Sequence, residues 1–122
     1  ADRIAPVFDL PRADDIVERI ATLAQSDPDL APIAATLRTR CPTSLAIALE
    51  THRAARSAAS IADVLAADVR LSGWVAAQPD FAEGVRAVLI DKTGAARWSP
   101  DHVDAARLDV IKGLISGADP AP

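Results

Sequence analysis

Helix-start signals followed by apolar residues at helical spacing recur along this chain, and they constrain its fold most strongly. Asp27-Pro28, Pro42 and Ser60 each precede such a run. Proline is tolerated in a first helical turn because its missing N–H would have no partner there. Asp and Ser side chains accept hydrogen bonds from the free N–H groups of that turn. Strand-like alternation barely occurs. Residues 88–90, the one stretch that could be a short buried strand, fit a helix better because of the preceding cap and the period of four. The pattern predicts an all-α chain of about six short helices.

Six helices are expected over residues 1–117, with residues 118–122 as a frayed tail. Their predicted starts are Asp9-Leu10-Pro11, Asp27-Pro28, Pro42, Ser60 with Asp63, Asp80 with Glu83, and Ser99-Pro100. The inward stripe expected of the fourth helix is Ile61, Val64, Leu65, Leu71 and Val75. The stripe expected of the fifth helix is Phe81, Val85, Val88 and Leu89. Gly117 suits the left-handed position that ends a helix.

The apolar half of the composition predicts a thin core. It consists mainly of alanine, and the chain has only two Phe and two Trp, with no Met or Tyr. Alanine favours helices but offers little area to bury. We therefore expect some apolar faces to be covered by another domain or by a second copy of the chain, which predicts a homo-oligomer.

Charge and hydropathy exclude several classes of partner and suggest a compartment. A net charge of −4 argues against nucleic-acid binding, which usually needs a basic surface. The arginines at 38, 40, 53 and 56 are either solvated side chains or a phosphate contact. No apolar run reaches the length of a membrane span, and no leader-like segment opens the sequence. These features predict a cytosolic protein without membrane contact.

A search for catalytic chemistry in the residues themselves finds no site. Cys41, His52 and His102 follow no recognised catalytic spacing, and one cysteine cannot form a metal cluster. Asp68 falls within the expected apolar stripe of its helix, so it is either an edge residue or a buried acid paired with an arginine. Trp98 is expected to cover a helix junction. We assign no catalytic residue and no metal site.

Gly84 lies inside the expected fifth helix, where glycine costs ~1 kcal/mol relative to alanine. That cost predicts the close approach of another element. Replacing Gly84 with alanine is then expected to destabilise the fold.

Three passages resemble hydrolase-type members of the crotonase superfamily, the enoyl-CoA hydratase/isomerase enzymes. They are CPTSL at 41–45, IADVL at 61–65 leading into VRL at 69–71, and DFAEGVRAVLIDK at 80–92 followed by RWSP at 97–100. Their order and spacing are similar over residues 41–100. The one visible departure is Cys41, where serine is usual, and this exchange of one small residue for another leaves the resemblance intact.

The resemblance implies the C-terminal helical module of an acyl-CoA hydrolase or hydratase, of the 3-hydroxyisobutyryl-CoA hydrolase type. In such enzymes an N-terminal ββα spiral core supplies the oxyanion hole and the acids, and neither is recognisable here. The helices then cover that core, close the acyl pocket, build subunit contacts and touch CoA. Phe81 and Lys92 are the candidates for CoA or lid contacts. No separate cofactor is implied, since CoA belongs to the substrate.

Two functions remain open at this point. The chain is either the helical end of such an enzyme, acting in valine catabolism or on related acyl-CoAs, or an independent helical interaction module without activity. A start without Met, inside what resembles a linker, favours the first. The sequence does not choose between hydrolase and hydratase or identify the acyl group.

Overall fold

The computed structural model describes residues 4–92 and 95–117, and these form helices joined by short connections. The helices are η1 (Ala5–Asp9), α1 (Ala13–Ala24), η2 (Pro28–Leu30), α2 (Ala31–Thr39), α3 (Pro42–Ala55), α4 (Ile61–Ala76), α5 (Pro79–Val85), η3 (Arg86–Ile90) and α6 (Ala105–Ser116). No strand occurs within these two ranges. The all-α prediction, with six α-helices, is confirmed. The expected tail at 118–122 lies outside the described residues.

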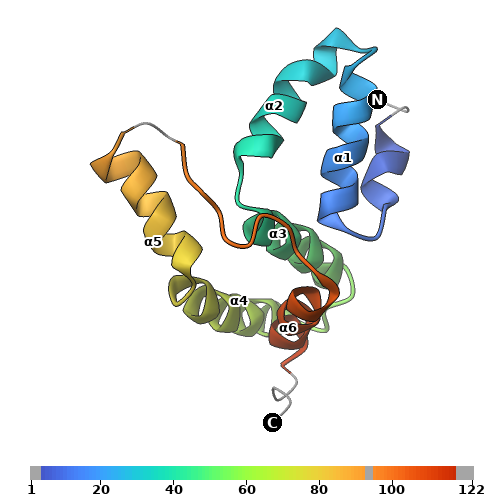
Figure 1. Ribbon diagram of the computed structural model, residues 1–122. Helices are drawn as coiled ribbons and strands as arrows, with labels where there is room; N and C mark the ends of the chain where they lie inside the picture. Colours follow the sequence, from blue (N-terminus) through green and yellow to red (C-terminus); the bar gives the residue numbers. More distant parts are fainter. Residues whose placement is uncertain (1–3, 93–94, 118–122) are drawn as a thin grey trace.

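Two arms diverge from a common base made of α3, α4 and α6 (Figure 1). One arm holds α1 and α2, which pack against each other, and α1 also contacts α3. The other arm holds α5 and η3, and α5 packs mainly against η3 and the end of α4. The chain returns from that arm across α3 to reach α6 (Figure 1). We call residues 95–104 of this return the strap.

The core consists of two apolar clusters rather than one. The first lies in the α1–α2 arm and is built on Val7, Ile16, Ile20 and Ala34. The second lies in the base and is built on Ala46, Leu71, Val103 and Ile111. Among the described residues, four of the eleven buried apolar residues are alanine, and Ile20 and Ile111 are the largest fully buried side chains, so the core buries modest apolar area. The prediction of a thin core is confirmed.

Several helix starts follow the sequence prediction, because the cap is local. Asp27 caps η2 by accepting a hydrogen bond from the N–H of Asp29 at 3.1 Å. The Ser60 hydroxyl accepts one from the N–H of Asp63 at 3.2 Å and opens α4. Pro42 begins α3. At the other end of the chain, Gly117 adopts φ 76°, the left-handed geometry expected of a helix end.

Three predicted helix starts are wrong. Residues 5–9 form a separate 3₁₀ turn, and α1 begins only at Ala13. The first turn of α5 opens at Pro79 without a side-chain cap, so Asp80 does not cap it. Ser99-Pro100 belongs to the strap, and α6 is instead capped by Asp104, whose carboxylate accepts from the N–H of Arg107 at 2.8 Å.

The predicted stripe of α4 is also partly wrong. Ile61 is 78% exposed and Leu65 is exposed as well, whereas Leu71 is buried as predicted. Ala67, which was not part of the predicted stripe, is also buried. The small side chain of Ala67 suits the close packing of α4 against α6. Asp68, next to Ala67, is exposed, so of the two alternatives it is the edge residue and not a buried acid paired with an arginine.

Within the described ranges, no helix is long and apolar enough to cross a bilayer.

Candidate functional site

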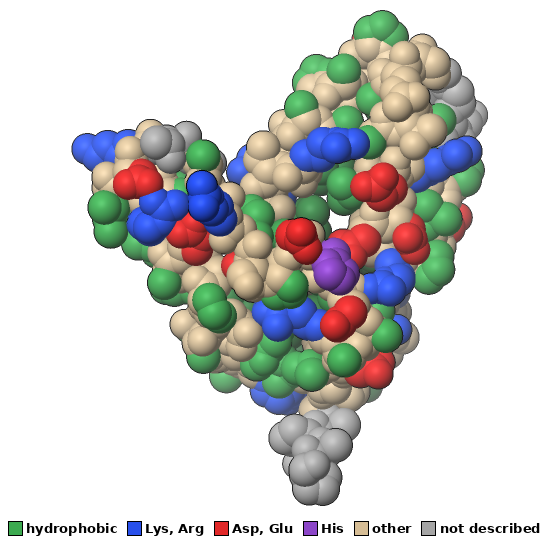
Figure 2. All heavy atoms as spheres, viewed as in Figure 1, with side chains coloured by type: hydrophobic (Ala, Val, Ile, Leu, Met, Phe, Trp, Pro, Cys, Tyr) green, Lys and Arg blue, Asp and Glu red, His purple; other side chains and the backbone are tan. Residues whose placement is uncertain are grey.

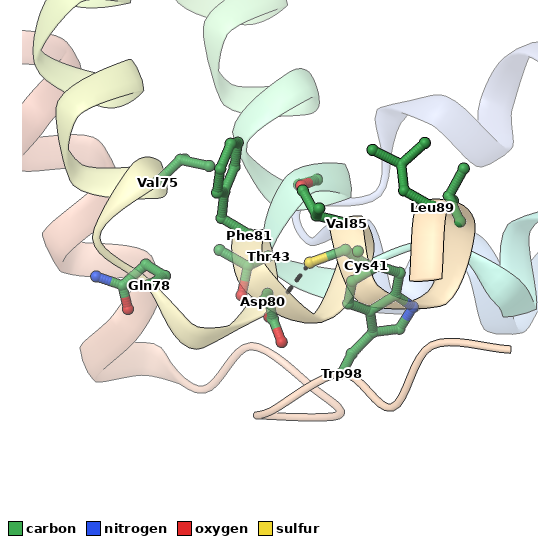
Figure 3. Close-up of a pocket in the computed structure, with 12 residues that line it drawn as sticks. Cys41, Thr43, Val75, Gln78, Asp80, Phe81, Val85, Leu89 and Trp98 are labelled. Carbon is green, nitrogen blue, oxygen red and sulfur yellow. Dashed lines mark hydrogen bonds between the residues drawn. The ribbon is translucent and has the colours of Figure 1, made fainter. Parts of the chain in front are cut away.

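An open pocket of about 430 Å³ lies where α5 meets α3, the end of α4 and the strap. Figure 3 shows Phe81 beside Val75, with Leu89 and Trp98 farther along. Most of the lining is apolar: it comprises Cys41, Thr43, Ser44, Val75, Gln78, Asp80, Phe81, Gly84, Val85, Val88, Leu89 and Trp98. An apolar pocket with a few polar groups at its edge is typical of a small-molecule site.

The apolar side of α5 and η3 is exposed rather than packed inward. Phe81, Val88 and Leu89 are each more than half exposed, and so is Ile90. The fifth predicted stripe is therefore apolar as expected, but it lines the pocket and the surface instead of the core. Figure 2 shows the surface hollowed between the two arms.

Arg107 holds the polar groups on one side of the pocket. Its Nε donates to the Thr43 hydroxyl at 3.0 Å, and one of its terminal nitrogens donates to Gln78 Oε1 at 3.1 Å. The guanidinium also lies 5.0 Å from the centre of the Trp74 ring. Because the Thr43 hydroxyl and Gln78 Oε1 both accept hydrogen bonds from Arg107, these polar atoms are already paired. The part of the pocket wall that Thr43 and Gln78 form is therefore less polar than the two residue types alone would indicate.

Asp80 is the buried acid of the site, only 7% exposed. One carboxylate oxygen accepts from the Cys41 thiol at 3.3 Å, and the other accepts from the backbone N–H of Ser99 at 2.7 Å. A buried carboxylate requires such donors. Asp80 thus joins α5 to the start of α3 and to the strap.

Trp98 covers the junction between α2 and α5, as predicted. Its indole N–H donates to the carbonyl of Thr39, at the end of α2, at 2.9 Å. The six-membered part of the ring faces Gly84 on α5. The strap is therefore a wall of the pocket and links the two arms.

A charged network lies next to the pocket on α5 and η3. Arg86 donates to both oxygens of Glu83, at 2.5 and 2.9 Å, and also pairs with Asp91. Glu83 accepts a further hydrogen bond from the backbone N–H of Arg97 at 2.8 Å. The hydrogen bonds from Arg86, and then that from Arg97, lower the pKa of Glu83 to about 2. The carboxylates raise the pKa of Arg86 in turn, so both groups stay charged.

The structure places the two residues predicted to contact CoA differently. Phe81 lines the pocket, whereas Lys92 is exposed beyond the end of η3 and is not part of the lining. Lys92 has φ 58°, a left-handed backbone geometry that is uncommon outside glycine. Both assignments to CoA stay predictions.

Sequence reasoning missed the acids that organise this site. Asp80 and Glu83 were predicted to form a helix cap, and no role was predicted for Asp91. The spacing of Glu83 and Arg86 was the available signal, since residues three apart on a helix pair readily. Of the four arginines considered for phosphate, Arg53 donates to the backbone carbonyls of Phe8, Leu10 and Pro11 and thus has a structural role. In the described part of the chain, no three potential metal ligands cluster.

Comparison with known proteins adds a family to this geometry. Residues 1–115 match the family model described as enoyl-CoA hydratase/isomerase. A 3-hydroxyisobutyryl-CoA hydrolase, mitochondrial, of Xenopus laevis is 44% identical over 78 residues, covering 62% of this chain and 20% of that protein. The Gallus gallus protein of the same name is 33% identical over 99 residues, covering 81% of this chain and 25% of that protein.

A third relative has a different name. The small ribosomal subunit protein mS47 of Schizosaccharomyces pombe is 38% identical over 94 residues, covering 72% of this chain and 21% of that protein. The chain thus spans about a fifth to a quarter of the length of these curated relatives. No solved structure matches it.

The predicted cytosolic location is wrong on this comparison. Four of the relatives are named as mitochondrial proteins. Charge and hydropathy alone do not determine the compartment of a protein, which explains the error.

Proposed function

Because the chain belongs to the enoyl-CoA hydratase/isomerase family, we propose that it is the C-terminal helical part of an acyl-CoA hydrolase. The favoured substrate is 3-hydroxyisobutyryl-CoA, by the names of its relatives. Their much greater length supports a parent protein in which another segment supplies the catalytic groups. A hydratase acting on enoyl-CoAs is the nearest variant of this proposal.

The observation that carries the proposal is the exposed apolar side of α5 and η3 around the pocket. Phe81, Val88 and Leu89 remain solvent-exposed in this chain. Contiguous apolar surface of this kind marks a ligand groove or an interface. In the parent enzyme we place the N-terminal part against this side, with the pocket closing over the acyl end or the pantetheine arm of the substrate.

Lys92 is the second element of the proposal. Its ammonium group is exposed at the end of the arm that lines the pocket. The phosphates of CoA are the anionic groups of the substrate, and lysine binds phosphate as a point charge. We assign Lys92 to a phosphate and Phe81 to the apolar part of the same ligand.

The test is the hydrolysis of 3-hydroxyisobutyryl-CoA by the complete gene product that contains this chain. Phe81→Ala is expected to raise KM by about three- to tenfold, since a buried aromatic contact is worth on the order of 1 kcal/mol or more. Phe8→Ala is the matched control, because Phe8 is exposed to a similar degree but lies on η1, outside the pocket lining. Equal effects of the two substitutions would refute the assignment of the pocket.

The second candidate function is an interaction module without activity. One observation favours it: the relative mS47 carries the name of a ribosomal subunit protein. Under this alternative, the exposed side of α5 and η3 binds another protein. A reading frame no longer than this chain, together with a folded monomer in solution, would favour the module over the enzyme segment.

A further inference from the structure

We propose that Glu83, Arg86 and Asp91 form a positioning network that holds Lys92 where its ammonium group meets a phosphate of CoA. The inference rests on the proposed function, which assigns that contact to Lys92. None of the three network residues needs to touch the ligand. They act through the backbone that carries Lys92.

Arg86 is the centre of the network. Its Nε and one terminal nitrogen bind both oxygens of Glu83, and its other terminal nitrogen binds Asp91. Two parallel hydrogen bonds to one carboxylate fix the plane of the guanidinium as well as its position. Glu83 is the less exposed partner, at 18% of its side chain, so α5 is the fixed base and Asp91 is the residue being held.

The backbone between Arg86 and Asp91 reinforces this hold. Residues Arg86–Ile90 form a single π-helical turn, closed by a hydrogen bond from the N–H of Asp91 to the carbonyl of Arg86 at 2.8 Å. The wider turn returns the Asp91 side chain to Arg86, five residues earlier in the chain. Such turns are rare, and they occur frequently at functional sites.

Lys92 follows Asp91, the residue that ends this turn, and has φ 58°. A left-handed lysine is unfavourable by itself, because its Cβ crowds the backbone. Unfavourable backbone geometry persists where the surroundings hold it, and it gathers at ligand clamps and active sites. The pair of Arg86 with Asp91 provides this restraint one residue away.

Glu83 holds the chain at a second point. Its Oε2, which accepts a hydrogen bond from a terminal nitrogen of Arg86, also accepts one from the backbone N–H of Arg97 near the beginning of the strap. One carboxylate therefore links α5, Asp91 through Arg86, and Arg97. Acidic and basic side chains gather at the outer end of the α5 arm (Figure 2). The two carboxylates outweigh the single positive charge of Arg86, so the exposed Lys92 is the residue at this end of the arm that can meet an anion.

The experiment measures the Kd of CoA and of pantetheine, which has no phosphate, by calorimetry with the complete gene product. Arg86→Lys keeps the charge but cannot bind two carboxylates in one plane. We expect it to weaken CoA binding by about three- to tenfold, and to leave pantetheine binding unchanged, since only a charge contact is displaced. Asp91→Asn is a second variant that keeps the side-chain shape. Arg19→Lys, on the exposed surface of α1, is the matched control.

Lys92→Ala distinguishes a failure of the positioning network from a failure of the proposed contact between Lys92 and CoA. The inference predicts that Lys92→Ala weakens CoA selectively and that adding Arg86→Lys causes no further loss. If Lys92→Ala weakens CoA while Arg86→Lys and Asp91→Asn do not, the network is refuted and the proposed function stands. If the two variants weaken CoA and pantetheine equally, their role is purely structural and the inference is wrong. If Lys92→Ala has no effect on CoA binding, or if the unaltered protein binds no CoA, both the Lys92 contact and the positioning network are refuted.

Discussion

The Trp98 ring lies at ordinary van der Waals distance from the place where a side chain at Gly84 would begin. A Cβ built on Gly84 would be 3.5 Å from Cη2 and 3.6 Å from Cζ3 of that ring. The close approach expected from the sequence therefore exists, but there is room for one methyl group. The expectation that Gly84→Ala destabilises the fold is contradicted by this geometry.

Gly84→Ala is now expected to stabilise the chain by about 0.5–1 kcal/mol, because alanine restricts the unfolded chain and favours the helix. Urea unfolding measures the change. Gly73→Ala is the matched control, since nothing lies within 4 Å of a Cβ there, and it is expected to give a similar gain. Gly84→Leu is expected to lose stability, because a larger side chain would displace Trp98. A loss of stability in Gly84→Ala would show that the ring approaches more closely than described.

Asp80→Ala is expected to destabilise the chain by about 1–3 kcal/mol, because it leaves the N–H of Ser99 and the thiol of Cys41 without their acceptor. Asp68→Ala removes the same side chain from an exposed position on α4 and is expected to stay within about 0.5 kcal/mol of the unaltered chain. Thermal unfolding of both variants checks the difference. Equal effects would mean that Asp80 does not anchor the strap.

The pKa of Glu83 predicts a specific acid dependence. The folded pKa of about 2 lies below the ordinary value of 4.5 for a glutamate. The contribution of Glu83 to stability is therefore complete above about pH 4.5 and is lost as the pH falls towards 2. Glu83→Gln is expected to flatten this part of the stability profile between pH 4.5 and 2. Glu18→Gln, an exposed position on α1, makes the same charge change as a control. A profile unchanged by Glu83→Gln would contradict the assignment.

Self-association of the 122-residue chain remains a prediction. Ile61, Leu65 and Val69 form an exposed apolar row on α4, in addition to the exposed side of α5 and η3. Analytical ultracentrifugation is expected to show association that increases with concentration. Leu65→Gln should weaken it if the α4 row takes part, and Leu89→Gln if the α5 side does. A folded monomer at high concentration would exclude it and strengthen the case for an independent module.

The elements that sequence predicted well depend on neighbours within a few residues. The Ser60 cap, the start of α3 at Pro42 and the left-handed Gly117 need only local geometry. Asp80 was misassigned, because α5 already begins at Pro79 and Asp80 therefore lies within the first turn instead of at the capping position. Here the strap returns 19 residues later and brings the N–H of Ser99 to the Asp80 carboxylate.

The candidate site was predictable only in part, for the same reason. Phe81 was identified through the family resemblance, and it does line the pocket. The partnership of Arg86 with Asp91 depends on a π-helical turn, whose extra residue has no clear sequence signal. The inward face of α4 was predicted wrongly, because the large apolar side chain of Ile61 was expected to be buried. In the structure Ile61 is exposed and the small Ala67 is buried, on a helix that packs against α6.

The most direct measurement of the central claim compares hydrolysis of 3-hydroxyisobutyryl-CoA by the complete gene product and by the isolated 122-residue chain. If the chain is the C-terminal helical part of the enzyme, the complete product releases CoA and the isolated chain gives no turnover above a blank. Turnover by the isolated chain, or no turnover of this or related acyl-CoA thioesters by the complete product, would contradict the account.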